Sequence, residues 1–365
     1  MSFSSLHTYL AACREQVVSK KAKKLVIGNE AADLDSMASS IVYAYYLASK
    51  NSNDNLSIIP VMPIPREDFK LRTEAVYVFE KGCINLDDVI FFDEINFAGL
   101  MAGDAQLVLV DHNKLAVSLE TYGNKVVEIL DHHRDEKLYP QASKKIIEMV
   151  GSTTTLVGDE LLNDNSDIIN DDIAMLLAGT ILLDTVNLDP EAGRVTPKDD
   201  KVAGELLKKC SIGQDKYFEN VQREKFNVSD LDTTDLLRKD YKEWNFGNTS
   251  CGIASALLPV TQWAEKDNTL CQGFSAYADT RGLDILLAMN AYTNPGFNRD
   301  LVIFVKNAGV HDELVNYLHQ QGLELNELEI SNQEACTAGK ISCYSQGNLG
   351  ISRKKLQPML VFFFR

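Results

Sequence analysis

Short apolar runs alternate with helix-like segments through the first half of this chain, and this alternation restricts the fold more than any other feature. The runs "KKLVIG", "AQLVLV" and "KVVEIL" have the length and apolar content of buried strands. "DSMASSIVYAYYLASK" has helical spacing, and "DIAMLLAGTILLDT" is apolar on most faces, which is typical of a buried helix. Strands that alternate with helices predict an α/β fold with a mainly parallel sheet, whose ligand crevice lies beyond the carboxyl ends of the strands.

The 365 residues are enough for two domains. The stretch "NLDPEAGRVTPKDDK" is rich in proline and charge and is predicted to be a loop. We expect the domain boundary near residue 212, in "SIGQDKYFEN", which gives domains of residues 1–212 and 213–365. The second part alternates again and has basic residues in "LLRKDYKEW" and "GISRKKLQP". The final "LVFFFR" is either a closing strand or a separate tail.

The net charge of −16 restricts the partners of the chain. Such a field repels polyanions, so we expect no binding to long nucleic acids or to anionic membranes, and an anionic substrate would need local attraction from metals or a few basic side chains. The seven cysteines are scattered without a CxxC pair, which argues against a disulfide framework and favours a reducing compartment. No run approaches the roughly 18 apolar residues of a membrane helix. The sequence therefore favours the cytoplasm.

Acidic residues follow four of the apolar segments. They are Asp33 and Asp35 in "GNEAADLDS", Asp111 in "VDHN", Asp184 in "ILLDT", and the triplet Asp131–His133. Singly, each aspartate is often a turn or cap residue, and a structural histidine pair is as plausible as a functional one. Carboxylates that converge on one crevice need cations to offset their repulsion, and carboxylate with imidazole suits Mg²⁺, Mn²⁺ or Co²⁺. Two such ions about 3.5–4 Å apart would activate a shared water for hydrolysis.

These motifs resemble the DHH phosphoesterase superfamily, which is named after the triplet Asp-His-His. "GNEAADLDS", "VDHN", "DHHR" and "ILLDT" match its four motifs in order. The C-terminal "SRKK" is similar to the second domain of manganese-dependent family II pyrophosphatases, eukaryotic exopolyphosphatases and prune proteins, and several longer stretches look most like prune. The resemblance implies a doubly wound first domain and a smaller mixed α/β domain that closes over the active site.

The resemblance also implies a set of metal ligands for two divalent ions, Mn²⁺ or Mg²⁺ and possibly Co²⁺. These ligands are Asp33, Asp35, Asp111, His132 and Asp184. Pyrophosphatases have a histidine ligand where this chain has Asn29, so Asn29 would be a weak ligand at most. Asp131 would orient His132 through the other nitrogen of its ring.

Further residues are implied in substrate binding and catalysis. His133 would face the phosphate as a cation or proton donor, and Asp111, His133 and Asp184 would form the catalytic group. Lys242, Arg353 and Lys354 would grip phosphate oxygens from the second domain. Arg66 is a further candidate for the substrate, but a surface ion pair with Glu67 or Asp68 is the favoured explanation. Ser152 in "GSTTTL" is expected to cap a helix, whose start near the crevice could also orient phosphate.

The activity implied by the resemblance is metal-dependent hydrolysis of phosphoanhydride bonds in short inorganic polyphosphate, including pyrophosphate. Two alternatives stay open at this point. One is a cyclic-nucleotide phosphodiesterase of the prune type, and the other is a largely non-catalytic scaffold for protein partners that the sequence does not identify. The intact acidic motifs favour an enzyme.

Overall fold

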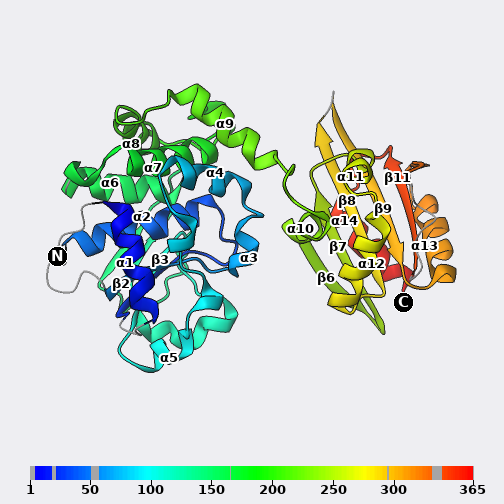
Figure 1. Cartoon of the computed structure of the whole chain (residues 1–365), viewed down its shortest axis with the longest axis horizontal. Helices are drawn as coiled ribbons and strands as arrows, with labels where there is room; N and C mark the ends of the chain where they lie inside the picture. Colours follow the sequence, from blue (N-terminus) through cyan, green and yellow to red (C-terminus); the bar gives the residue numbers. More distant parts are fainter. Residues whose placement is uncertain are drawn as a thin grey trace. The chain divides into compact units, whose positions relative to one another are not determined.

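The computed structural model describes residues 5–18, 22–50, 57–164, 166–293, 296–330 and 339–364. The chain divides into two compact units, Met1–Phe226 and Asn227–Arg365 (Figure 1). The division therefore lies after Phe226 and not near residue 212 as expected. The reason is helix α9 (Gln214–Phe226), which packs against α4 (Thr73–Lys81) and α7 (Asp171–Asp184) of the first unit.

The first unit is built on a five-stranded, entirely parallel sheet with the order β2-β1-β3-β4-β5. The strands are β1 (Lys24–Ile27), β2 (Ile58–Val61), β3 (Gln106–Val110), β4 (Val126–Asp131) and β5 (Lys144–Ile147). The remaining helices are α1 (Leu6–Val18), α2 (Leu34–Lys50), α3 (Arg66–Phe69), α5 (Phe97–Ala102), α6 (Thr153–Asp164) and α8 (Pro197–Leu207). The mainly parallel α/β architecture predicted from the sequence is confirmed.

The strand order positions the ligand crevice. The chain leaves β1 toward β2 on one side, whereas β3 leads to β4 on the other side, so the connections diverge between β1 and β3. In parallel sheets this divergence opens a crevice at the carboxyl ends of the strands. The segment after β1 contains Asn29, Asp33 and Asp35, and Asp111 follows β3 directly.

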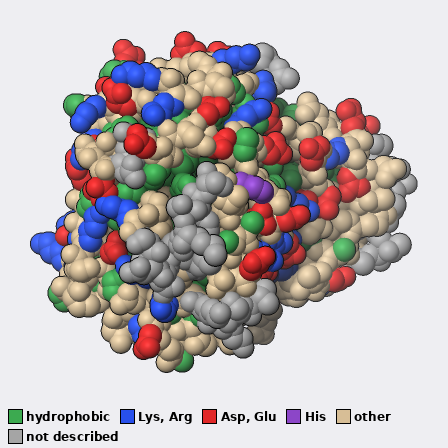
Figure 2. Space-filling model, turned by 60° about the vertical axis from the view of Figure 1, so that its left-hand side comes forward, with side chains coloured by type: hydrophobic (Ala, Val, Ile, Leu, Met, Phe, Trp, Pro, Cys, Tyr) green, Lys and Arg blue, Asp and Glu red, His purple; other side chains and the backbone are tan. Residues whose placement is uncertain are grey.

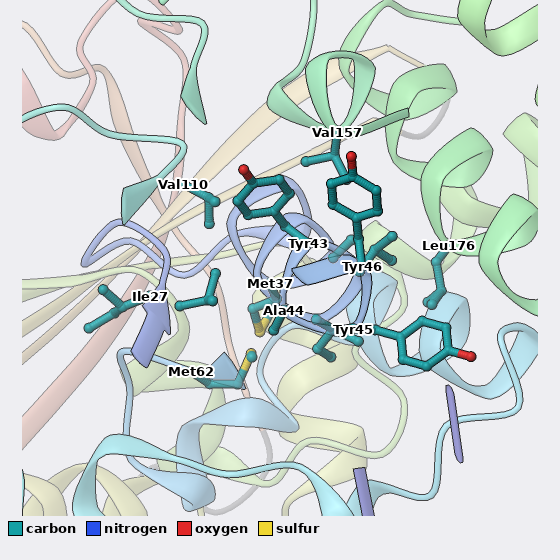
Figure 3. Close-up of a cluster of buried hydrophobic side chains, with 14 of the residues drawn as sticks. Ile27, Met37, Tyr43, Ala44, Tyr45, Tyr46, Met62, Val110, Val157 and Leu176 are labelled. Atoms are coloured by element: carbon teal, nitrogen blue, oxygen red, sulfur yellow. The ribbon is translucent and has the colours of Figure 1, made fainter. Parts of the chain in front are cut away.

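Helices α2 and α7 explain the most apolar stretches of the sequence. Helix α2 packs on β1, β2 and β3 and also on α6 and α7, and Figure 3 shows its Met37 and Ala44 among side chains of the sheet and of neighbouring helices. Helix α7 packs on the helices α2, α4, α6, α8 and α9. A helix surrounded by other helices must be apolar on most faces, which accounts for "DIAMLLAGTILL".

Helix α8 begins at Pro197, within the stretch that was predicted to be a loop. Thr196 and Asp199 form a capping box, in which the Asp199 carboxylate accepts the Thr196 N–H at 2.7 Å, and Pro197 occupies the first turn. The end of "NLDPEAGRVTPKDDK" is therefore helical, because local capping outweighs the loop-like composition.

The second unit has a six-stranded mixed sheet with the order β10-β11-β9-β8-β7-β6, in which only β7 and β8 pair in parallel. Its strands are β6 (Tyr241–Phe246), β7 (Thr249–Ala256), β8 (Ile285–Thr293), β9 (Phe297–Val305), β10 (Leu325–Glu327) and β11 (Lys340–Gln346). Its helices are α10 (Thr233–Lys239), α11 (Val260–Lys266), α12 (Leu270–Arg281), α13 (Ala308–Gln320) and α14 (Arg353–Phe363).

The C-terminal phenylalanines end a helix, so the expected closing strand is wrong. Helix α14 runs to Phe363, and the ring of Phe364 stacks on Phe246 of β6 with centroids 6.1 Å apart. This packing buries part of the apolar end against the second core, while Phe362 stays 72% exposed.

Two further sequence expectations can be compared with the structure. Of the helices that the structure describes, none combines the length and apolar character of a membrane-crossing segment. Five cysteines are free thiols, at positions Cys13, Cys83, Cys210, Cys251 and Cys343. Cys271 is disulfide-bonded, which the expectation of reduced cysteines did not include.

An ion-pair network around Glu94 predicts how the stability of the first unit depends on pH. Burial alone would raise the pKa of Glu94, but hydrogen bonds from Arg14 and Arg66 outweigh it and lower this pKa from 4.5 to about 2. Because the pKa of Glu94 is lower in the folded state, its ionisation stabilises the folded protein at pH values above the unfolded pKa. This contribution is lost as pH falls from about 4.5 toward 2. We expect Glu94→Gln to lower the free energy of unfolding by about 2 kcal/mol at pH 7 and by much less at pH 3.

Urea unfolding of wild type and variant between pH 7 and pH 3 measures this difference. Glu205→Gln is a suitable control, because it removes only the exposed pair with Lys208, and it should change the free energy of unfolding by less than about 0.5 kcal/mol. An effect of Glu94→Gln that does not vary with pH would contradict the ion-pair explanation.

Candidate metal centre

Asp35 closes the N-terminus of helix α6. Its carboxylate is 4% exposed and accepts the N–H groups of Thr153 and Thr154 at 2.7 and 2.8 Å, together with the Ser152 hydroxyl at 2.7 Å. The cap of this helix is therefore Asp35 from α2, and Ser152 supports it instead of acting as the cap itself. The N–H groups of Thr153 and Thr154 already donate to Asp35, so this helix start does not offer them to phosphate.

Asp111 follows β3 in a left-handed conformation with φ of 61° and is 2% exposed. Its Oδ2 accepts hydrogen bonds of 2.6 Å from Asn29 Nδ2 and from Ser36 Oγ. The other oxygen, Oδ1, lies 3.4 Å from His132 Nε2 and 3.8 Å from His133 Nδ1. Oδ2 is thus anchored by two short hydrogen bonds, whereas Oδ1 accepts only a longer one, of 3.3 Å from Thr153 Oγ1, and faces the imidazoles.

The ring of His132 is oriented by a backbone carbonyl. Its Nδ1 lies 2.9 Å from the Val150 carbonyl oxygen, and its Nε2 lies between the carboxylates of Asp111 and Asp35, 3.8 Å from the latter. When Nδ1 carries the proton of a neutral ring, Nε2 presents its lone pair to these carboxylates, which is the arrangement of a metal ligand. Burial lowers the pKa of His132, but the neighbouring carboxylates outweigh it and raise this pKa to about 10. The pocket therefore holds positive charge strongly at the position of Nε2.

Asp131 contacts His133, so the expectation that it orients His132 is wrong. Asp131 is fully buried, and its Oδ1 accepts the backbone N–H of His133 at 3.2 Å and lies 2.8 Å from His133 Nδ1. The side chain of Asn113 donates to its other oxygen. The turn after β4 brings the Asp131 side chain back onto the second histidine, while His132 points toward Val150. His133 is 56% exposed at its side chain, with Nε2 available to a ligand.

Asp33 and Asp184 complete the acidic group. The Asp33 carboxylate accepts the Ser36 N–H at 3.0 Å and so caps helix α2, and burial followed by repulsion from Asp35 raises its pKa. Asp184 ends helix α7, where the helix dipole disfavours a negative charge. Its Oδ2 is buried without a hydrogen-bond partner among the described residues. Burial, followed by repulsion from Asp35 and Asp33, raises the pKa of Asp184 well above its ordinary value.

The donor set fits a divalent cation. A pocket of about 510 Å³ is lined by six of the side chains that the sequence singled out, namely Asp33, Asp35, Asp111, His132, His133 and Asp184. One ligand atom each from Asp111, His132 and His133 lie within 4.8 Å of one another. An unpartnered buried carboxylate oxygen and several crowded acids are costly unless a cation offsets them. Carboxylate oxygens with imidazole nitrogen suit Mg²⁺ or Mn²⁺.

Asn29 supports this group and does not point its amide oxygen into it. The oxygen accepts the N–H groups of Ala31 and Ala32 at 2.9 and 3.2 Å, while the amide nitrogen donates to Asp111. Arg72 holds the same loop by donating to the carbonyls of Ala31 and Ala32 at 2.9 and 3.2 Å. No sequence pattern indicates this role of Arg72, because its partners are backbone carbonyls distant along the chain.

The basic residues expected at the substrate lie in different environments. Arg66 donates to Glu94 at 2.6 Å and to the Val89 carbonyl at 2.6 Å, and it is not part of the pocket lining, so its proposed contact with substrate is not supported. Arg353 donates to the carboxylate and carbonyl of Asp240 at 2.6 and 2.9 Å within the second unit. Lys242 and Lys354 are exposed in the same unit.

Two arginines that the sequence analysis did not single out line the pocket. Arg134 directly follows the histidine pair, and Arg194 lies between α7 and α8. The position of Arg134 next to His133 was a usable signal. The position of Arg194 in the pocket lining depends on the path of the connection between α7 and α8, which the sequence pattern does not indicate. Figure 2 shows a histidine reaching the surface on a face where acidic and basic side chains are interspersed.

Comparisons with known proteins agree with these observations. The DHH family N-terminal domain matches residues 23–181, and the DHHA2 domain matches residues 219–361. The chain is 32% identical over 363 residues to exopolyphosphatase PRUNE1 of Homo sapiens, covering 97% of this chain and 78% of that protein. It is 25% identical over 269 residues to a manganese-dependent inorganic pyrophosphatase of Methanothrix thermoacetophila, covering 72% and 79%.

A solved structure supports the fold. The crystal structure of a Methanococcus jannaschii protein assigned to the family II inorganic pyrophosphatases aligns with a TM-score of 0.50 and 20% identity, covering 93% of this chain and 99% of the other. At this identity the likeness concerns the fold alone.

Metal binding should depend on the unpartnered oxygen of Asp184. We expect Mn²⁺ to raise the thermal unfolding temperature of the wild type and to have little effect on Asp184→Asn, because the variant loses a charged ligand. Without metal, the variant should be more stable than the wild type by about 1–2 kcal/mol, since a crowded buried carboxylate has been removed. Thermal and urea unfolding with and without Mn²⁺ measure both effects. Equal metal stabilisation of the two proteins would contradict the assignment.

Proposed function

The chain belongs to the DHH family, in the branch that carries a DHHA2 domain and contains the prune exopolyphosphatases, and on this premise we propose that it hydrolyses the phosphoanhydride bonds of short inorganic polyphosphate, including pyrophosphate. The observation that carries the proposal is the pocket at the carboxyl ends of β1, β3 and β4, where four carboxylates, two of them buried (Asp35 and Asp111), meet two imidazoles. Such a group binds divalent cations, and cations are what an acidic protein needs to attract a polyphosphate.

Two divalent ions, Mn²⁺ or Mg²⁺, are the proposed cofactors. Asp33, Asp35, Asp111, His132 and Asp184 would hold them. Bound divalent ions of this kind lower the pKa of water and offset the charge that develops on phosphoryl oxygens. Asp111 would be a preorganised ligand, because Asn29 and Ser36 fix its Oδ2 while its Oδ1 faces His132.

His133 is the proposed proton donor and phosphate ligand. Its Nδ1 donates to Asp131, which leaves Nε2 free and exposed at the pocket. The hydrogen bond with Asp131 raises the pKa of His133 above its ordinary value, which favours the protonated ring. A protonated imidazole there would neutralise a phosphate oxygen and supply a proton to the leaving phosphate.

The second unit would add further cations. Arg353 is already engaged by Asp240, whereas Lys242 and Lys354 are exposed, with no ion pair to either within the described part of the chain. We therefore propose Lys242 and Lys354 as direct phosphate ligands. Arg353 would order the start of helix α14 and bind phosphate only by leaving Asp240.

A neighbouring cavity favours nucleotide phosphodiester hydrolysis as a second candidate. It measures about 720 Å³ and is lined by Asn29, Phe92, His112, Lys114 and Leu115, among others. Asn29 donates to Asp111, so this cavity adjoins the metal centre. An aromatic and aliphatic wall beside basic side chains is suited to a nucleobase. A purely non-catalytic scaffold is less consistent with the intact acidic group.

Removing the charge of Asp111 tests the proposal. We expect Asp111→Asn to lower phosphate release from pyrophosphate, tripolyphosphate and longer chains by at least about 10³-fold, because a proposed metal ligand loses its charge. The assay uses metal-stripped protein resupplied with Mn²⁺ or Mg²⁺, with circular dichroism to verify folding. Asp104→Asn, at an exposed position outside the pocket, is the matched control. Turnover of cyclic AMP alone would favour the second candidate, and no turnover by wild type would reject both.

The pairing of Asp131 with His133 predicts a change in pH dependence. A raised pKa keeps His133 protonated to higher pH, and activity that needs this proton falls as pH rises through that pKa. In Asp131→Asn the carboxylate is lost, so the decline should begin at lower pH, and kcat should fall about 10–100-fold. A pH–rate profile with saturating metal measures both changes. An unchanged alkaline limb would contradict the role of the pair.

A further inference from the structure

Arg134 and Arg194 line the metal pocket from two separate connections. Arg134 follows β4, and Arg194 lies in the segment between α7 and α8. Both side chains are exposed, and no described residue forms an ion pair with either guanidinium. Other arginines differ in this respect, since Arg14, Arg281 and Arg353 are each held by a carboxylate. The pocket therefore has two available guanidinium groups next to its acidic interior.

The backbone that carries each arginine is fixed by a buried polar side chain. Asn113 is 4% exposed, and it donates to the Arg134 carbonyl at 3.0 Å and accepts the Glu136 N–H at 2.8 Å. Asp199 is fully buried and accepts the N–H groups of Gly151 and Thr196 at 2.9 and 2.7 Å. These bonds tie the two connections to the body of the unit. Each guanidinium is therefore carried by an exposed side chain on a backbone segment that hydrogen bonds hold in place.

The five proposed metal ligands and His133 are suited to hold only a small part of a polyphosphate. Pyrophosphate has two phosphoryl groups, and the proposed ions and His133 would bind both. Every longer chain extends past this group and brings additional negative charge toward a protein whose net charge is −16. Guanidinium groups match phosphate oxygens in geometry as well as charge, because they can donate two parallel hydrogen bonds.

We propose that Arg134 and Arg194 form a subsite for the phosphates of a polyphosphate chain beyond the two at the metal centre, and so favour tripolyphosphate and longer chains over pyrophosphate. This inference rests on the proposed function, because it assigns the part of the same substrate that the ligand group does not hold. The exposed side chain of Met149, also in the pocket lining, adds no charge that would oppose the chain.

The test compares chain lengths. R134Q, R194Q and the double variant are assayed with Mn²⁺ on pyrophosphate, tripolyphosphate and a longer polyphosphate. We expect kcat/KM for tripolyphosphate to fall about tenfold more than kcat/KM for pyrophosphate in the double variant, mainly through KM. R134K and R194K should restore part of the loss, since the charge returns without the bidentate geometry. R223Q removes an arginine of α9 outside the pocket and should leave the ratio of the two substrates unaltered.

The outcomes separate this inference from the proposed function. An equal fall for all substrates would mean general electrostatic attraction, and no fall for any would mean that the arginines do not bind substrate; either result overturns the subsite. If wild type hydrolyses no polyphosphate, the proposed function fails. In that case calorimetric binding of tripolyphosphate and pyrophosphate with Mn²⁺ still decides the subsite. The inference requires the double variant to lose affinity for tripolyphosphate about tenfold more than for pyrophosphate.

Discussion

Four carboxylates share one pocket in the first unit, and their mutual repulsion is the constraint on which the rest of the site depends. The repulsion is visible in the raised pKa of Asp35, which burial and Asp111 bring to about 6, and of Asp184. Hydrogen bonds offset part of this cost for Asp35 and Asp111, whereas Asp184 has a buried oxygen with no described partner. The remaining imbalance makes the pocket selective for cations.

The hydrogen bonds that offset the repulsion also fix the geometry of the pocket. Asp35 joins the first turn of α2 to the start of α6, and Asp111 joins the end of β3 to the connection after β1. Each of these bonds links segments that are distant along the chain but meet at the carboxyl edge of the sheet. The strand order opens a crevice there, and the same bonds that hold its walls together direct the remaining ligand atoms inward.

The basic side chains of the pocket lie at different depths. His132 lies deepest, between Asp111 and Asp35, and His133 lies at the pocket surface with its proton held by Asp131. Arg134 and Arg194 line the pocket as exposed side chains. Under the proposed function, this gradation would allow a protein with a net charge of −16 to bind a polyanionic substrate without a broad basic surface.

The sequence by itself determined the parallel α/β fold and which acidic and imidazole side chains meet at its edge, because Asp33, Asp111 and His132 each follow an apolar strand and parallel strands end at one edge. It did not determine the partner of each polar group. Only the tertiary structure paired Asp131 with His133 and Arg66 with Glu94. Strand and helix patterns repeat over a few neighbouring residues and are therefore legible in the sequence. Hydrogen-bond partners are set by loops that meet across the fold, at distances of a few ångströms that no local pattern encodes.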